Sequence, residues 1–102
     1  MKVLCLCKRG NSRSAQLAYI LKDIHGINAM AMGIESNGDD ILQMLGGWAD
    51  KIVLVDKTFA DRIPKEYRHK LKIWDVGEDR FFLGVHPELM QKYQDYIKND
   101  PL

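Results

Sequence analysis

The chain has 102 residues, of which 46% are hydrophobic and 28% are charged, and its formal net charge is +1. This length suits one compact domain over residues 1–102 and excludes a second, while the near-neutral charge excludes a general affinity for nucleic acid or a membrane surface. The apolar run at residues 3–7 is too short for a signal peptide or a membrane span, so we expect a cytoplasmic protein.

The first third of the chain predicts a strand, a helix and a second strand. Residues 2–6 are an apolar run that suits a buried strand. From about residue 12 to residue 24, apolar side chains recur at i, i+3, i+4 and i+7, which is the spacing of an amphipathic helix. This helix should end at Gly26, because glycine readily adopts the left-handed conformation that follows a helix end. Residues 27–34 are the second candidate strand.

The remaining two thirds repeat this alternation. Residues 38–40 can start a helix, and the two glycines at 46–47 are expected to end it. The later predicted elements are a strand over 51–55, a short helix from 57 to about 63, a strand over 70–76 and a last helix that Pro87 opens.

The alternation of strands and helices indicates the fold class. We expect an α/β fold with three layers, in which helices cover both faces of a four-stranded parallel sheet. In such folds ligands bind at the carboxyl ends of the strands. The first strand ends at Cys7, which directs attention to the segment that follows it.

This segment combines a cysteine with an arginine six residues later and a serine after that, between a strand and a helix. A loop in this position can turn successive N–H groups inward and bind three phosphate oxygens. The same N–H groups would favour the thiolate of Cys7, the reactive form of a nucleophilic cysteine. Arg13 would hold two phosphate oxygens with its planar guanidinium, and the hydroxyl of Ser14 could hydrogen-bond the thiolate. The predicted phosphate-binding residues are Lys8, Arg9, Gly10, Asn11, Ser12, Arg13 and Ser14.

A plainer interpretation remains open at this stage. Cys7 could be an ordinary buried strand cysteine, and Arg13 a solvated helix residue. Cys5 and Cys7 are the two cysteines of the sequence, and their i, i+2 spacing points both side chains to the same face of a strand. We expect no disulfide between them, because their Cα atoms would lie near the upper distance limit.

The strand, the Cys-x5-Arg-Ser loop and the following helix resemble the low-molecular-weight protein tyrosine phosphatases and their short bacterial and phage relatives. Residues 48–56 are similar to the third-strand region of that family, and residues 86–89 to the start of its last helix. The resemblance implies a phosphatase that works through a phosphocysteine intermediate, with phosphotyrosine protein or a small aryl phosphate as substrate. We expect no cofactor, and no metal site because His25, His69 and His86 have no ligand spacing. The near-neutral charge likewise predicts no nucleic-acid or membrane partner.

The family also uses an aspartate after the fourth strand to protonate the leaving group. In this chain the matching loop contains Asp75, Glu78 and Asp79. We narrowly favour Asp75 as the general acid, because it directly ends the strand, with Asp79 as the close alternative.

Three other functions remain open. An arsenate reductase needs further thiols, and Cys5 is the one thiol available besides Cys7. A phosphocysteine carrier of the sugar-transport type also uses a cysteine at the end of a first strand, but such carriers generally lack the closing arginine. A non-catalytic phosphate-binding module is the third alternative.

Overall fold

The computed structural model describes residues 1–10, 12–78 and 86–102 of the chain. Its centre is a four-stranded, all-parallel sheet in the order β2-β1-β3-β4. This arrangement confirms the expected α/β fold with four parallel strands. The strands are β1 (Lys2–Cys7), β2 (Asn28–Gly33), β3 (Lys51–Leu54) and β4 (Leu71–Ile73).

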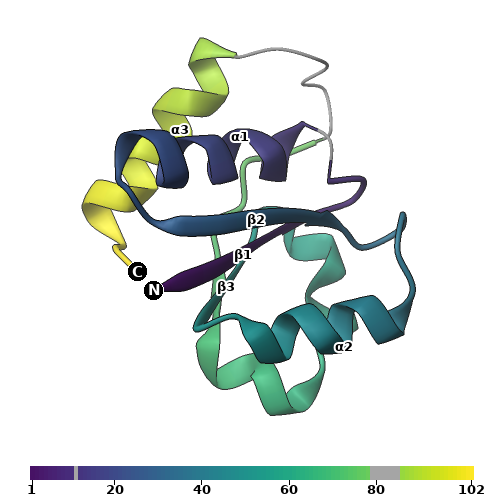
Figure 1. The fold of residues 1–102 in the computed structure, drawn as a ribbon. Coiled ribbons are helices and arrows are strands. Elements are labelled where there is room, and N and C mark those ends of the chain that lie inside the picture. Colours follow the sequence, from purple (N-terminus) through teal and green to yellow (C-terminus); the bar gives the residue numbers. More distant parts are fainter. Residues whose placement is uncertain (11, 79–85) are drawn as a thin grey trace.

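Helices lie on both faces of the sheet (Figure 1). Helix α1 packs on one face together with α3, and α2 packs on the other face. The first predicted helix is divided, because its last turn widens from an α-helix into a π-helix. The helices are α1 (Arg13–Tyr19), the π-helical turn η1 (Ile20–Ile24), α2 (Asp39–Trp48), the 3₁₀ helices η2 (Lys57–Arg62) and η3 (Lys65–Lys70), and α3 (Pro87–Asn99).

Strand β1 is apolar throughout because both of its faces are buried. Val3, Cys5 and Cys7 point toward α1 and α3, whereas Leu4 and Leu6 pack with residues of α2. Alternating side chains of one strand therefore serve two separate cores. This arrangement fixes β1 in the middle of the molecule and brings its carboxyl end to the edge where a ligand is expected.

Helix α2 does not end at Gly46 and Gly47 as predicted, because it continues to Trp48. The ring of Tyr67 lies against both glycines, and a Cβ atom at Gly46 would be 2.6 Å from Cδ2 of that ring. The hydroxyl of Tyr67 donates a hydrogen bond to the carbonyl oxygen of Gln43 at 2.9 Å. These glycines therefore allow close packing of an aromatic ring, and they do not stop the helix.

The fourth strand is also shorter than predicted, since β4 ends at Ile73 and the prediction extended to residue 76. Trp74 and Val76 are buried, which explains the strand-like pattern of apolar residues. The indole N–H of Trp74 donates to Asp100 at 3.1 Å, and its ring stacks on Tyr96 with centroids 5.6 Å apart. The segment still runs beside β3, because the N–H of Trp74 donates to the carbonyl oxygen of Leu54 at 2.9 Å and that of Val76 to Val55 at 3.1 Å.

Candidate functional site

Three strands deliver the candidate residues to one edge of the sheet. Cys7 ends β1, Asp56 follows β3 after one residue, and Gly77 lies beyond β4. Because the strands are parallel and β1, β3 and β4 are successive neighbours, their carboxyl ends meet on the same side. The loop from β1 to α1 begins at this edge.

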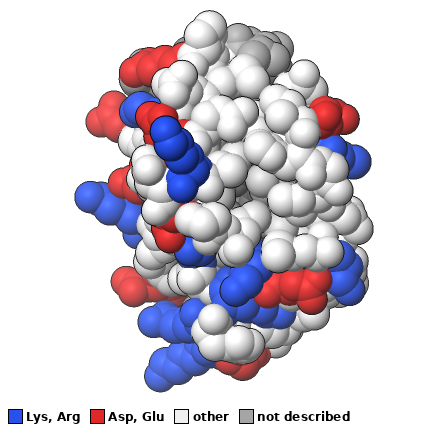
Figure 2. All heavy atoms as spheres, turned by 90° about the vertical axis from the view of Figure 1, so that its left-hand side faces the viewer, with Lys and Arg blue, Asp and Glu red and all other residues white. Residues whose placement is uncertain are grey.

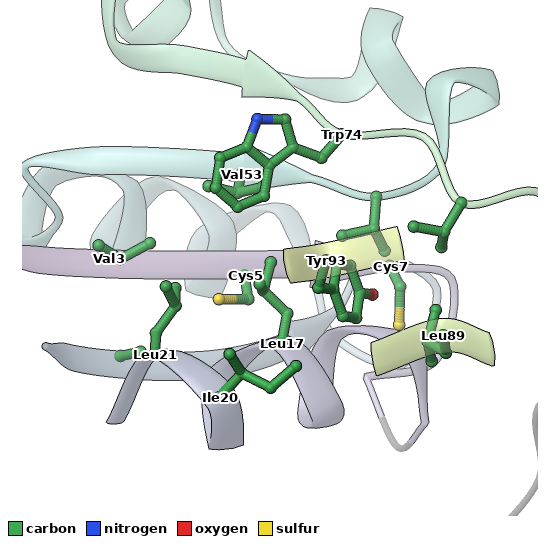
Figure 3. Packing of buried hydrophobic residues seen from close by; sticks show 13 residues of the cluster. Val3, Cys5, Cys7, Leu17, Ile20, Leu21, Val53, Trp74, Leu89 and Tyr93 are labelled. Atoms are coloured by element: carbon green, nitrogen blue, oxygen red, sulfur yellow. The ribbon is translucent and has the colours of Figure 1, made fainter. Parts of the chain in front are cut away.

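Cys7 is 2% exposed, and its sulfur lies where β1 turns toward α1. Figure 3 shows the side chains of Cys5 and Cys7 on the same side of β1, with the sulfur of Cys7 beside Leu89 of α3. The N–H of Gly10 donates to Sγ of Cys7 at 3.0 Å, and Oγ of Ser14 lies 3.1 Å from the same sulfur. Two polar groups of the loop therefore contact this sulfur, unlike that of an ordinary core cysteine.

Cys5 lies in a different environment, although it is two residues away. Its side chain is fully buried among apolar residues, and both cysteines are free thiols, as predicted. Burial raises the pKa of the Cys5 thiol far above its usual value, and the nearby Cys7 raises it further. Cys5 therefore stays a neutral thiol, which leaves Cys7 as the candidate nucleophile.

Gly10 has a positive φ of +77°, a conformation that glycine adopts readily. It also packs directly on β2, since a Cβ atom at Gly10 would lie 2.4 Å from the nitrogen of Gly33. The converse holds at Gly33, where a Cβ atom would lie 2.2 Å from the carbonyl carbon of Arg9. Two glycines thus let the loop rest on the end of β2.

Main-chain bonds hold the start of the loop against the segment after β2. The N–H of Glu35 donates to the carbonyl oxygen of Lys8 at 2.9 Å, and Oγ of Ser36 donates to that of Arg9 at 3.2 Å. The side chain of Arg9 is exposed, and that of Lys8 lies 3.9 Å from Glu35. The hydrogen bonds described for these two residues use their carbonyl oxygens, and the side chain of Lys8 adds an ion pair with Glu35.

The other predicted loop residues lie at the start of α1. Ser12 is buried and its carbonyl oxygen accepts the N–H of Gln16 at 2.9 Å, which begins the helix. Ser14 is fully buried against Cys7. Asn11 lies outside the described residues.

Arg13 is not a solvated helix residue, because its side chain is 0% exposed. Its Nη1 donates to Oδ2 of Asp56 at 2.9 Å and to the carbonyl oxygen of Gly77 at 2.9 Å. The hydroxyl of Tyr93 on α3 donates to the carbonyl oxygen of Arg13. A buried guanidinium is therefore fixed from two sides at the edge of the sheet where Cys7 ends β1.

Asp56 is the site residue to which the sequence analysis gave no function. Its Oδ1 accepts the N–H of Thr58 at 3.0 Å and the hydroxyl of Thr58 at 2.6 Å, while Oδ2 binds Arg13. Burial opposes ionisation, but the bonds from Thr58 and Arg13 outweigh it and lower the pKa of Asp56. Asp56 is thus an ionised partner of Arg13. Its position directly after a buried strand next to β1 was the signal that could have identified it.

Asp75 is half-buried beside this pair. Its Oδ1 accepts the N–H of Gly77 at 3.2 Å, and its Oδ2 lies 3.9 Å from Nζ of Lys57. The hydroxyl of Tyr96 donates to its carbonyl oxygen at 2.7 Å, which anchors this segment to α3. A hollow of about 210 Å³ is lined by Asp56, Lys57, Thr58, Asp75, Gly77 and Glu78.

The structure describes two of the three acidic residues in the loop that was predicted to supply the general acid. Asp75 and Glu78 line the hollow that also contains Asp56, the partner of Arg13. Asp79, the alternative to Asp75, lies outside the described residues.

In the described ranges, no group of three or more histidine, cysteine, aspartate or glutamate side chains is arranged to hold a metal ion. No helix in that part of the chain has the length and apolar character needed to cross a membrane. Comparison of the chain with protein-family models, with curated proteins and with solved structures finds no match.

Proposed function

We propose that this chain is a Cys-dependent phosphomonoesterase of the low-molecular-weight protein tyrosine phosphatase type. Its substrate would be phosphotyrosine in a protein or a small aryl phosphate. One observation supports the proposal most strongly: the sulfur of Cys7 contacts Gly10 and Ser14, while Asp56 holds the guanidinium of Arg13 at the same edge of the sheet. A thiolate nucleophile and an adjacent fixed cation are what phosphoryl transfer requires.

In the first step the thiolate of Cys7 attacks the phosphorus atom. A sulfur–phosphorus bond forms as the bond to the phenolic oxygen breaks, and the leaving oxygen takes a proton from the carboxyl group of Asp75. Arg13 offsets the charge on the phosphate oxygens during this transfer. Asp56 does not supply the proton, because it is held ionised by Thr58 and Arg13.

In the second step water attacks the phosphocysteine. The carboxylate of Asp75 accepts a proton from this water, the sulfur–phosphorus bond breaks and inorganic phosphate leaves. The sulfur recovers its electron pair as a thiolate, which the hydroxyl of Ser14 stabilises from 3.1 Å. Ser14 therefore assists the departure of sulfur in this step.

The discriminating experiment compares two alanine variants that remove the same atoms two residues apart. Hydrolysis of para-nitrophenyl phosphate should be abolished in Cys7→Ala and retained in Cys5→Ala, because Cys5 is buried away from the loop. Mass spectrometry of the rapidly quenched wild type should detect a phosphoryl group on Cys7. Turnover that survives in Cys7→Ala would refute the proposal.

Two of the alternatives give different results in the same experiment. A phosphate-binding module would bind inorganic phosphate in a calorimeter but show no turnover. A phosphocysteine carrier would accumulate phosphorylated Cys7 and release phosphate slowly until an acceptor is added. The arsenate reductase alternative is tested with arsenate and a thiol reductant in place of the aryl phosphate.

We further propose a cytoplasmic location. Cys5 and Cys7 are both free thiols, and a reducing compartment keeps thiols in that state. Activity should accordingly require a thiol reductant in the assay buffer. Full activity after prolonged incubation without a reductant would count against this location.

A further inference from the structure

The sheet ends on one side at β2, which contacts β1 and has no strand beyond it in the described part of the chain. All six residues of β2 are uncharged, and none is a proline. Exposed edge strands usually carry charges, prolines or bulges that prevent them from pairing with another chain. Strand β2 has neither a charge nor a proline to protect it.

The opposite edge is protected in the usual way. Strand β4 has three residues, and the central one is Lys72, whose Nζ binds Asp100 at 2.7 Å. A short strand with a charged residue at its centre is a poor template for pairing. The contrast between the two edges indicates that β2 is normally covered.

The main chain of β2 shows which groups a partner strand would meet. The N–H of Ile34 donates to the carbonyl oxygen of Cys7 at 2.9 Å, so even-numbered residues face β1 and odd-numbered residues face outward. Outward-facing Gly33 already has its oxygen bonded to Nδ2 of Asn37 at 3.0 Å. Among the described residues no hydrogen bond reaches the outward groups of Ala29 and Ala31. The main-chain groups that have no described bond therefore lie on either side of Met30, at Ala29, which is 6% exposed, and at Ala31, which is half-buried.

We propose that the chain forms a two-fold dimer in which β2 pairs antiparallel with β2 of a second copy. Ala29 of each copy would exchange two hydrogen bonds with Ala31 of the other, and Met30 would face its own counterpart on the two-fold axis. The two four-stranded sheets would then join into one continuous sheet. This interface leaves the carboxyl ends of the strands open, so the proposal is independent of the proposed function.

The lack of charge on β2 favours a second copy as the partner. A two-fold interface places each residue close to its own counterpart, so like charges at its centre would repel, and β2 has none. Strand β2 lies on the side of the molecule that faces the viewer in Figure 1. In Figure 2, which is turned by 90°, this side forms the right-hand half of the picture. Most of that half is uncharged.

Exposed apolar side chains border the same edge. Met30 is 41% exposed and lies on the face covered by α2, because its neighbour in β1 is Leu4. Ile41 of α2 is also exposed, and its helical spacing places it on the side of α2 opposite the pair Gly46 and Gly47, where Tyr67 packs. These two side chains would lose contact with water in the dimer.

Sedimentation equilibrium of the purified full chain tests the proposal. The wild type should have twice the monomer mass of 11.8 kDa, and Met30→Lys should have the monomer mass because two lysines would meet on the axis. Met30→Glu should be monomeric for the same reason, and an equal mixture of both variants should recover the dimer. The matched control is Ile73→Lys on β4, which has the same 41% exposure and should remain dimeric.

The recovery by mixing shows that each variant is folded, because an unfolded chain cannot restore the dimer. A wild type that is monomeric throughout the measurable concentration range would overturn the proposal. So would a Met30→Lys variant that stays dimeric, a mixture that stays monomeric, or a control that dissociates as fully as Met30→Lys.

Discussion

Replacing Gly33 with alanine should displace the candidate phosphate loop without changing any residue in it. The added Cβ would lie 2.2 Å from the carbonyl carbon of Arg9 and 2.3 Å from its oxygen. Carbon atoms in contact normally stay about 3.5–4.0 Å apart, so the loop must move by more than about 1 Å. Overpacking of this kind costs roughly 1–3 kcal/mol of stability.

The displacement should reach the sulfur of Cys7, because Gly10 follows Arg9 directly. The nitrogen of Gly10 lies 3.0 Å from that sulfur, and a shift of about 1 Å would weaken their hydrogen bond severely. Misplacement on this scale can lower catalysis by about a hundredfold. We therefore expect Gly33→Ala to reduce kcat on para-nitrophenyl phosphate by one to two orders of magnitude, about 10- to 100-fold.

The assay combines steady-state kinetics with urea unfolding. The control is Gly38→Ala, since a Cβ atom at Gly38 would meet nothing within 4 Å. The control should keep kcat and lose less than about 1 kcal/mol, because Gly38 precedes α2 as its N-cap. If Gly33→Ala matches the control in both measurements, the loop does not depend on β2 as described.

Three further predictions concern the groups around the loop. Asp56→Asn removes the charge that faces buried Arg13, so unfolding should show a loss near the low end of the ~3–5 kcal/mol typical of such pairs. The folded pKa of Asp56 is lowered, so its contribution to stability is complete above the unfolded pKa of about 3.9 and is lost as pH falls through the folded pKa. The free energies of unfolding of wild type and Asp56→Asn should therefore converge in acid. Tyr93→Phe loses the hydrogen bond to the carbonyl oxygen of Arg13 and should cost about 1 kcal/mol in denaturant unfolding, and an unchanged midpoint would contradict this bond. Ser14→Ala should slow breakdown of the phosphocysteine more than its formation, so stopped-flow traces should show a larger burst than the wild type gives. A burst of unchanged size would show that the hydroxyl has no effect on the thiolate.

The sheet could be predicted because its strands are short apolar runs separated by helix-length segments. The predictions are wrong where tertiary packing, and not the local sequence, determines the structural role of a residue. Gly46 and Gly47 have the sequence signature of a helix end, yet they leave room for the ring of Tyr67, which lies 20 residues after Gly47 in the chain. No local pattern distinguishes these two uses of glycine.

The contacts of the candidate site between residues close in the sequence were predictable, and the contacts between distant segments were not. Cys7 and Ser14 meet because one short loop separates them, and their spacing is visible in the sequence. The partnership of Arg13 with Asp56 joins residues 43 positions apart, so it needed the order of the strands as well as the motif. The contact between Gly10 and Gly33 was missed for the same reason, since it depends on where β2 lies beside β1.

The bond from Tyr93 to Arg13 has a consequence for how the molecule is made. A ribosome releases Cys7, the candidate nucleophile, first, and it releases Tyr93, which bonds to Arg13, 86 positions later. A partly synthesised chain therefore contains the sulfur of Cys7 before the residues that surround the proposed site are complete. The proposed site would be complete only after α3 has been synthesised and has packed against the sheet.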